Sequence, residues 1–210
     1  MLIFFMTDRV FSVIKEGAVM PKIFSEREKE NIIKGLLETC RQSWTQYGYK
    51  KTSVDELCRQ VGISKGAFYI FFDSKEALFC EVLCCVQKEI FDAASQVMDQ
   101  RQDRTGAAEA IKLVYREYAK NNFLYNSNST DFTILTNKLS EEQLQKILHS
   151  NEQSKLLFLE KPYLHLKVDA DMAISVIYAL IMSVKINDTI PNHLEVFDFM
   201  VDHLIDDIYE

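Results

Sequence analysis

Proline and glycine are scarce in this chain, which has three prolines and six glycines among its 210 residues. No segment alternates apolar and polar residues over the length of a strand, which is the pattern of a half-buried sheet. Apolar side chains recur instead three and four positions apart, as they do on one face of an α-helix. The sequence therefore predicts an all-α protein with about nine helices.

Motifs of catalysis are also missing. The sequence contains no Walker loop, no glycine fingerprint for a dinucleotide, no HExxH pair and no nucleophile elbow. The adjacent acids Glu141 and Glu142 fit the first turn of a helix that Ser140 caps. We therefore expect no catalytic residue and no cofactor.

The five cysteines are an odd number and no secretory signal precedes them, so a disulfide framework is not expected. Cys80, Cys84 and Cys85 fall on one predicted helix, and no histidine or second cysteine pair stands beside them at metal-ligand spacing, so no metal site is assigned. Two interpretations of this cluster stay open. The thiols are either small side chains in a helical core or a thiol-based redox or metal sensor.

The first twenty residues, 1–20, are interpreted as an N-terminal extension. Residues 2–6 are apolar but far too few to span a bilayer. Asp8 and Arg9 follow directly, which fits a secretory signal poorly. We expect a cytoplasmic protein that makes no use of a membrane.

Residues 52–79 have the pattern of two short helices joined by a tight turn. Either Thr52 or Ser53 would cap the first helix through its hydroxyl. Gly62 stands where the backbone needs a positive φ, and Ser64 would cap the second helix. This spacing predicts a helix-turn-helix within an N-terminal three-helix bundle.

The second of these helices has two different faces. Phe68 and Phe71, three positions apart, would anchor it on the first helix. Its other face is small and polar enough to lie in a DNA groove, and it carries Ser64, Lys65, Gly66, Ala67 and Tyr69.

These residues resemble the tetracycline-repressor-like (TetR) regulators. The resemblance covers residues 25–80 and rests on four strings in register: Tyr47-Gly48-Tyr49, Thr52-Ser53-Val54, Val61-Gly62-Ile63-Ser64-Lys65-Gly66, and the run from Phe68 to Leu78. Cys58 and Phe68 depart from the residues that the family often has there. The resemblance implies a DNA-binding domain at 21–80, an effector-binding and dimerisation domain at 81–210, and a double-stranded DNA operator read by a homodimer.

Ten residues form the candidate DNA-binding set: Thr52, Ser53, Ser64, Lys65, Gly66, Ala67, Phe68, Tyr69, Phe72 and Lys75. Lys65 is expected to reach a base edge or a phosphate. Tyr69 would hold a phosphate through its hydroxyl, as the matching tyrosine does in the family. For Lys75, a phosphate contact and a solvated side chain remain alternatives.

The net charge of −7 is unevenly distributed along the chain. Residues 21–80 have a net charge of +2, while the rest of the chain has a net charge of −9. An acidic body would repel phosphates and so help confine DNA to one face of the protein.

Two apolar segments, at about 171–187 and 191–209, have more apolar surface than one chain needs to cover. They suit a two-fold four-helix bundle, and the resemblance implies the same dimer. The expected interface residues are Val176, Ile177, Leu180, Ile181, Leu194, Phe197, Val201, Leu204 and Ile205. Burial in the core of one chain is the alternative.

Aromatic residues are dense in the middle of the chain, where the resemblance implies a pocket for an unknown small-molecule effector. The candidate pocket residues are Phe91, Tyr115, Tyr118, Phe123, Phe132, Phe158, Tyr178 and Met182. Ordinary core packing would explain the same residues. The function predicted is that of a repressor released by an effector; a constitutive DNA-binding dimer and a thiol-responsive regulator are the alternatives.

Overall fold

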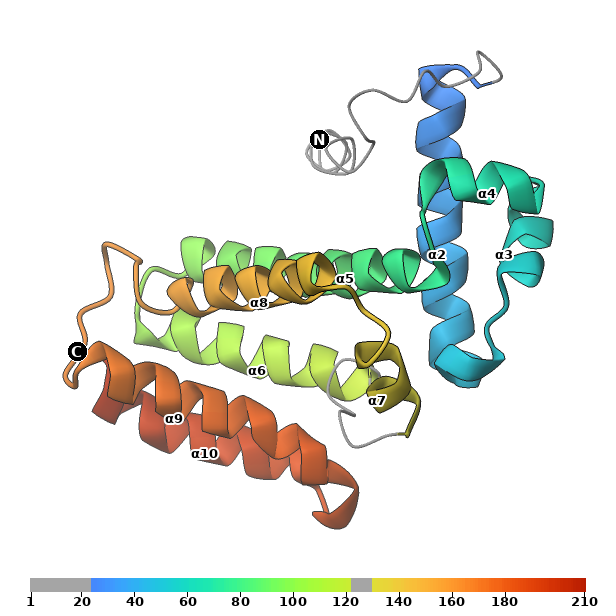
Figure 1. Cartoon of the computed structure of the whole chain (residues 1–210). Helices are drawn as coiled ribbons and strands as arrows, with labels where there is room; N and C mark the ends of the chain where they lie inside the picture. The colour runs from blue at the N-terminus through green and yellow to red at the C-terminus, as the bar shows by residue number, and fades with distance from the viewer. Residues whose placement is uncertain (1–23, 122–129) are drawn as a thin grey trace. The chain divides into compact units, whose positions relative to one another are not determined.

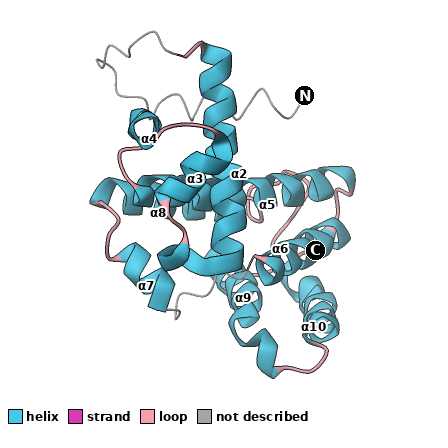
Figure 2. Ribbon diagram, turned by 90° about the vertical axis from the view of Figure 1, so that its right-hand side faces the viewer, coloured by secondary structure: helices cyan, strands magenta, loops and turns pink. Residues whose placement is uncertain are grey.

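The computed structural model describes residues 24–121 and 130–210, and within these ranges it contains helices and loops but no strand (Figures 1 and 2). The described helices are, in chain order, α2 (Glu26–Lys51), α3 (Val54–Val61), α4 (Lys65–Phe71), α5 (Lys75–Gln100), α6 (Arg104–Lys120), α7 (Thr130–Thr136), α8 (Glu141–Leu156), α9 (Ala170–Met182), the 3₁₀-helix η3 (Ser183–Thr189) and α10 (His193–Ile208). The all-α prediction is confirmed. The predicted extension at 1–20 and the pocket residue Phe123 lie outside the described residues.

The chain divides within α5 into two units, one up to Val82 and the other from Leu83 onward. In the first unit, α2 begins with a capping box, in which the Ser25 hydroxyl accepts from the Glu28 amide and the Glu28 carboxylate accepts from the Ser25 amide. Gly48 interrupts α2 with a φ of 81°. This residue was the predicted end of that helix.

Helices α2 and α3 pack closely in the first unit. A β-carbon on Gly35 of α2 would lie 3.2 Å from a methyl group of Val61, so glycine allows the two helices to approach. At the other end of α2, the rings of Trp44 and Tyr49 pack on Phe79, with centroid distances of 4.5 and 5.0 Å. These buried aromatics hold the C-terminal end of α2 against the first turns of α5.

In the second unit, α10 packs along α6 and α9 (Figure 1). Three ion pairs join α6 to α10 along their length: Arg104–Asp206 at 2.8 Å, Lys112–Asp202 at 2.6 Å and Arg116–Asp198 at 2.5 Å. The numbering runs in opposite directions on the two helices, so the pairs fix an antiparallel register. Each pair adds little energy where it is exposed, but a helix shifted by one turn would lose its match.

The C-terminus is tied into the second unit by main-chain and side-chain hydrogen bonds. The amide of Lys167 donates to the carbonyl of Ile208, and the amide of Glu210 donates to the carbonyl of His165, both at 2.9 Å. Tyr209 is fully buried, and its hydroxyl donates to the carbonyl of Phe158 at 2.7 Å. The segment after α8 is thereby fastened to the end of the chain.

Buried tyrosines make the second unit sensitive to alkali. Burial raises the pKa of Tyr118 to about 12, and it also raises the pKa of Tyr209. Because both pKa values are higher in the folded than in the unfolded chain, their contribution to stability is complete below pH ~10 and is lost as the pH rises through ~12. We expect the free energy of unfolding to fall over this interval, and to fall less steeply in Tyr118→Phe. Urea titrations at a series of pH values measure it.

Tyr69→Phe is the matched control for that titration, because Tyr69 is 49% exposed and lies in the first unit. Its stability profile should follow that of the unmodified protein. An equal change of slope in both variants would contradict the assignment to burial.

Candidate nucleic-acid interface

Side-chain caps and one glycine set the geometry of α3 and α4. The Ser53 hydroxyl accepts from the Glu56 amide at 3.2 Å, so Ser53 and not Thr52 caps α3. Gly62 ends α3 in the left-handed conformation with a φ of 78°. The Ser64 hydroxyl accepts from the Ala67 amide at 3.1 Å and starts α4. The predicted turn chemistry of a helix-turn-helix is therefore present.

The inner face of α4 is anchored by phenylalanines. Phe68 is fully buried and Phe71 is 8% exposed, and both lie among the core residues of the first unit. The ring of Phe24, directly before the α2 cap, lies 5.7 Å from the ring of Phe71. This burial holds α4 as a fixed rod and leaves its opposite face outward.

The outward face of α4 is small and polar. Ser64, Lys65 and Gly66 are exposed, and Tyr69 keeps 49% of its surface. A β-carbon on Gly66 would meet only the Ser64 hydroxyl, at 3.8 Å, so neither packing nor backbone conformation in this unit requires glycine there. What the missing side chain provides is room for an outside surface to come close to the helix.

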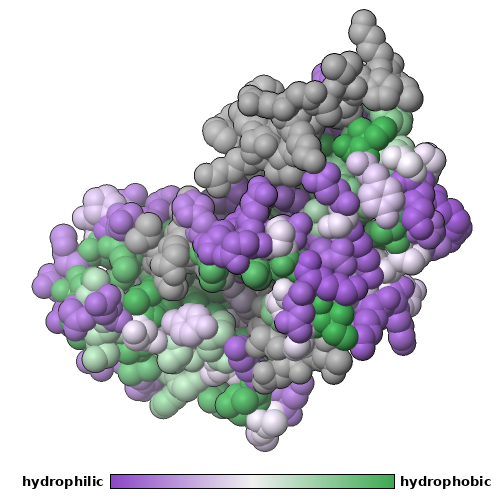
Figure 3. Space-filling view, in the orientation of Figure 1, coloured by the Kyte–Doolittle hydropathy of each residue, from purple (hydrophilic) through white to green (hydrophobic). Residues whose placement is uncertain are grey.

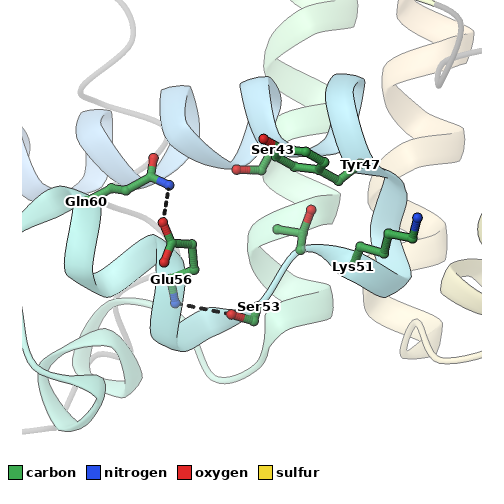
Figure 4. Close-up of a pocket in the computed structure, with 7 residues that line it drawn as sticks. Ser43, Tyr47, Lys51, Ser53, Glu56 and Gln60 are labelled. Atoms are coloured by element: carbon green, nitrogen blue, oxygen red, sulfur yellow. Dashed lines mark hydrogen bonds between the residues drawn. The ribbon is translucent and has the colours of Figure 1, made fainter.

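A polar hollow of about 330 Å³ lies between the end of α2 and the start of α3 (Figure 4). It is lined by Ser43, Tyr47, Lys51, Thr52, Ser53, Glu56 and Gln60. The N-terminal end of α3, with its partial positive charge, and the Lys51 ammonium both lie at this hollow. Tyr47, which is 53% exposed, and Lys51 were not among the predicted DNA contacts.

Two carboxylates on α3 govern the charge near α4. The Lys65 ammonium lies 2.9 Å from Asp55, and both side chains are exposed. Glu56 accepts hydrogen bonds from Arg59 and Gln60, which lower its pKa to about 2. Glu56 is therefore charged at neutral pH, and together with the Asp55–Lys65 ion pair it neutralises part of the positive charge on this face.

Residues 36–82 match the family model described as "Bacterial regulatory proteins, tetR family". The HTH-type transcriptional regulator YhgD of Bacillus subtilis is 38% identical over 64 residues, which are 30% of this chain and 34% of YhgD. Residues 36–82 are similar to the DNA-binding segment of the TetR family. Because the alignment spans only about a third of YhgD, it bears on the helix-turn-helix and leaves the second unit unaddressed.

Solved structures of TetR-family regulators have a similar fold over most of this chain. PfmR of Thermus thermophilus has a TM-score of 0.58 at 21% identity, over 81% of this chain and 96% of that one. FadR of Bacillus subtilis, solved in complex with stearoyl-CoA, has a TM-score of 0.56 at 16% identity, over 83% of this chain and 98% of that one. At these identities the likeness concerns the fold alone.

Four of the ten predicted DNA-binding residues are buried. Ala67, Phe68 and Phe72 are 8%, 0% and 4% exposed, so the two phenylalanines have almost no surface to offer a duplex and instead support α4 from behind. Thr52 is 3% exposed, and its hydroxyl donates to the carbonyl of Gly48 at 2.9 Å. Phe68 has the anchoring position that its spacing predicts, whereas Thr52, Ala67 and Phe72 offer a duplex little surface.

Lys75 is engaged within the first unit. Its ammonium donates to the carbonyl of Tyr49 at 2.5 Å and lies 4.0 Å from the centroid of the Tyr49 ring. The side chain is half-buried and joins the start of α5 to the end of α2. The solvated lysine considered from the sequence is therefore wrong, and a phosphate contact would require Lys75 to leave these partners.

The outer side of α9 and α10 carries exposed apolar residues (Figure 3). Met172 and Tyr178 on α9 and Phe199 on α10 are 53%, 54% and 63% exposed. Between the two helices lies an apolar hollow of about 270 Å³, lined by Val176, Ala179, Leu180, Ser183, Met200 and Leu204. Contiguous exposed apolar surface of this kind is typical of a protein interface.

The predicted dimer residues fall on both sides of these helices. Val176, Leu194 and Leu204 face outward, whereas the other six are 7% exposed or less: Ile177, Leu180, Ile181, Phe197, Val201 and Ile205. Phe197 stacks on Tyr115 of α6 at a centroid distance of 3.7 Å. The buried six are core residues of one chain, which is the alternative that the sequence left open for them.

The predicted effector residues are similarly divided. Tyr115, Tyr118 and Phe158 are buried, Phe91, Phe132 and Met182 are half-buried, and Tyr178 lies on the outer face of α9. Neighbouring side chains occupy the space around Tyr115: the Phe197 ring stacks on it, and His193 lies 3.3 Å from its hydroxyl. Neither of the two hollows described above is lined by these residues. Tyr178 is therefore removed from the pocket set.

Cysteines and metal-ligating groups give no reactive site in the described ranges. Burial raises the pKa of the Cys40 and Cys58 thiols, which disfavours the reactive thiolate. Cys80 is buried, and Cys84 and Cys85 are partly exposed. No group of three or more His, Cys, Asp or Glu side chains among residues 24–121 and 130–210 could hold a metal ion.

One helical stretch of the described chain, Ala170–Thr189, is apolar and long enough to cross a bilayer by composition, with a mean hydropathy of 1.4. A single such stretch is weak evidence for a span, because helices of soluble proteins have the same composition. Only 33% of it is buried in the chain, which is in keeping with the exposed apolar face of α9.

Proposed function

We propose that this protein is a transcriptional regulator whose helix α4 enters the major groove of an operator. The observation that carries the proposal is the outward face of α4, where Lys65, Gly66 and Tyr69 are exposed while Phe68 and Phe71 fix the helix from behind. A short helix without a side chain at position 66 can approach the groove floor closely. Lys51 and Ser53, at the polar hollow, would hold the adjacent phosphates.

The regulator would act as a homodimer through the exposed apolar face of α9 and α10. One helix of seven residues reads too few base pairs for useful specificity. Two copies related by a two-fold axis would read two half-sites about one helical turn apart, and the operator would be palindromic. A second copy would also cover Phe199, Tyr178 and the hollow between the helices.

We further propose that a small molecule bound in the second unit releases the operator. Helix α5 runs unbroken from Lys75 to Gln100, so its first turns belong to the DNA-binding unit and the rest to the second unit. A ligand shifts the equilibrium only by its difference in affinity for the two states, and a tenfold loss of DNA binding needs about 1.4 kcal/mol. The complex of FadR with stearoyl-CoA makes a long-chain acyl-CoA the first compound to test.

Thermal unfolding separates this mechanism from that of a constitutive regulator. An effector that binds the folded state raises the melting temperature in proportion to the logarithm of its concentration. A constitutive DNA-binding dimer would show no such rise with any compound of a metabolite library. A change in operator affinity on oxidation, reversed by a thiol reductant, would favour the thiol-responsive alternative instead.

Selection of bound fragments from random duplex DNA tests the proposed function as a whole. We expect a palindrome, because a two-fold dimer imposes its symmetry on the site. A protein that retains no duplex at low salt would contradict the proposal.

Removing the Tyr69 hydroxyl tests the role of α4. Tyr69→Phe is expected to weaken binding of operator and random duplexes alike by roughly tenfold, since a hydrogen bond to a charged phosphate is lost while the ring stays. Fluorescence anisotropy with labelled duplexes measures the change. Tyr163→Phe is the control, because it also removes a tyrosine hydroxyl, one that donates to Asp99 in the second unit, and it should bind as the unmodified protein does.

A further inference from the structure

Lys65, which is a proposed DNA contact, also has a charged partner within the protein. Its ammonium donates to the Asp55 carboxylate at 2.9 Å, and the two side chains are 53% and 69% exposed. Lys65 is the first residue of α4, where the positive end of the helix dipole disfavours a cation. Asp55 lies in the first turn of α3, where a carboxylate is favoured. The pair therefore relieves an unfavourable charge at the start of α4.

An exposed ion pair is weak enough to be broken by a better partner. Pairs of this kind contribute at most about 1 kcal/mol, so DNA can capture Lys65 when it offers several contacts at once. A non-cognate duplex offers phosphates but no base edges that fit the rest of α4. The pair thus lowers the affinity for every duplex by a similar factor, so at a given protein concentration only a duplex with further contacts stays bound.

We propose that Asp55 restrains DNA binding by holding Lys65 on the protein surface, so that a duplex must displace the carboxylate before Lys65 can contact it. This inference rests on the proposed DNA binding and adds a restraint to it. Asp55 itself touches no base in this account; it acts through Lys65. The negative charge of Asp55 also lowers the positive potential that α4 presents to DNA.

Replacing the carboxylate isolates the effect. Asp55→Asn is expected to raise affinity for a random-sequence duplex about three- to fivefold and to steepen its salt dependence by about one unit in log K against log salt, because Lys65 is then free to contact a phosphate. Operator affinity should rise by a similar factor, so the ratio of operator to random affinity stays about the same. Asp55→Ser is the second variant, in case asparagine disturbs the start of α3, and thermal unfolding of each variant verifies the fold.

Two controls separate this route from the loss of a negative charge alone. Asp73→Asn removes an equal charge from an exposed position directly before α5 and reports the general effect on the field. In a Lys65→Met background, Asp55→Asn should change random-duplex affinity no more than Asp73→Asn does. An undiminished effect of Asp55→Asn in that background, or equal effects of the two asparagine variants in the unmodified protein, would overturn the inference.

A measurement without DNA distinguishes failure of this inference from failure of the proposed function. The hydrogen bond to Asp55 raises the pKa of Lys65, so the Lys65 Cε resonance should titrate at lower pH in Asp55→Asn. An unchanged titration means that the pair does not form, and the inference fails even if the operator is bound. A normal pair in a protein that binds no duplex would instead refute the proposed function.

Discussion

Replacing Phe199 with aspartate is expected to leave the protein monomeric and to lower operator affinity by about a hundredfold or more. Phe199 is 63% exposed on α10, packs on His203 with a ring distance of 4.0 Å, and belongs to the apolar face formed with α9. A carboxylate there would have to be desolvated on pairing of two copies, and by two-fold symmetry it would enter the interface twice. A dimer gains its affinity from binding the second half-site intramolecularly, a gain of roughly 10²–10⁴ that a monomer loses.

Sedimentation equilibrium and anisotropy on the same samples measure both consequences. Leu148→Asp is the matched control, because Leu148 is 54% exposed on α8 and lies outside the α9–α10 face. That control should remain dimeric and bind the operator normally. If Phe199→Asp sediments as a dimer, the face proposed for the second copy is wrong.

Tyr209→Ala is expected to reduce the stability of the second unit by about 3–5 kcal/mol. Loss of a large, fully buried aromatic leaves a cavity, and costs of this size are typical of such deletions. The variant also leaves the Phe158 carbonyl without the hydroxyl that now donates to it at 2.7 Å. The segment after α8 would lose its attachment to the end of the chain.

Tyr209→Phe separates the two parts of that loss. It keeps the ring and removes only the donor, so we expect a cost of about 1–2 kcal/mol. Urea unfolding followed by circular dichroism measures both variants. A Tyr209→Ala variant as stable as Tyr209→Phe would mean that the ring packs too loosely to support the C-terminus.

The helix-turn-helix could be predicted from the sequence because its signals are local. Ser53, Gly62 and Ser64 act on the amides and φ angles of their own neighbours, and the structure has each in its predicted role. The sequence left the cap of α3 open between Thr52 and Ser53, because both hydroxyls are close enough to act. The structure assigns it to Ser53, since the Thr52 hydroxyl is used at the end of α2.

The errors arose where a side chain has a distant partner. For Lys75 the sequence offered only a phosphate contact or a solvated side chain, because the Tyr49 carbonyl and ring that hold it are 26 residues away. Tyr178 appeared suited to a pocket because periodicity reports that a helix is apolar without saying which side is inward. Lys51 and Tyr47 were missed because the hollow they line forms only where α2 and α3 meet.

By itself, the sequence determined the helical class, the turn between α3 and α4, and the polar outer side of α4, since capping, backbone propensity and spacing act over a few residues. Tertiary packing alone decided which apolar side of α9 and α10 is buried, and it placed Asp55 within 2.9 Å of Lys65. Those choices depend on contacts between segments that are separate in the chain, and no local pattern carries that information.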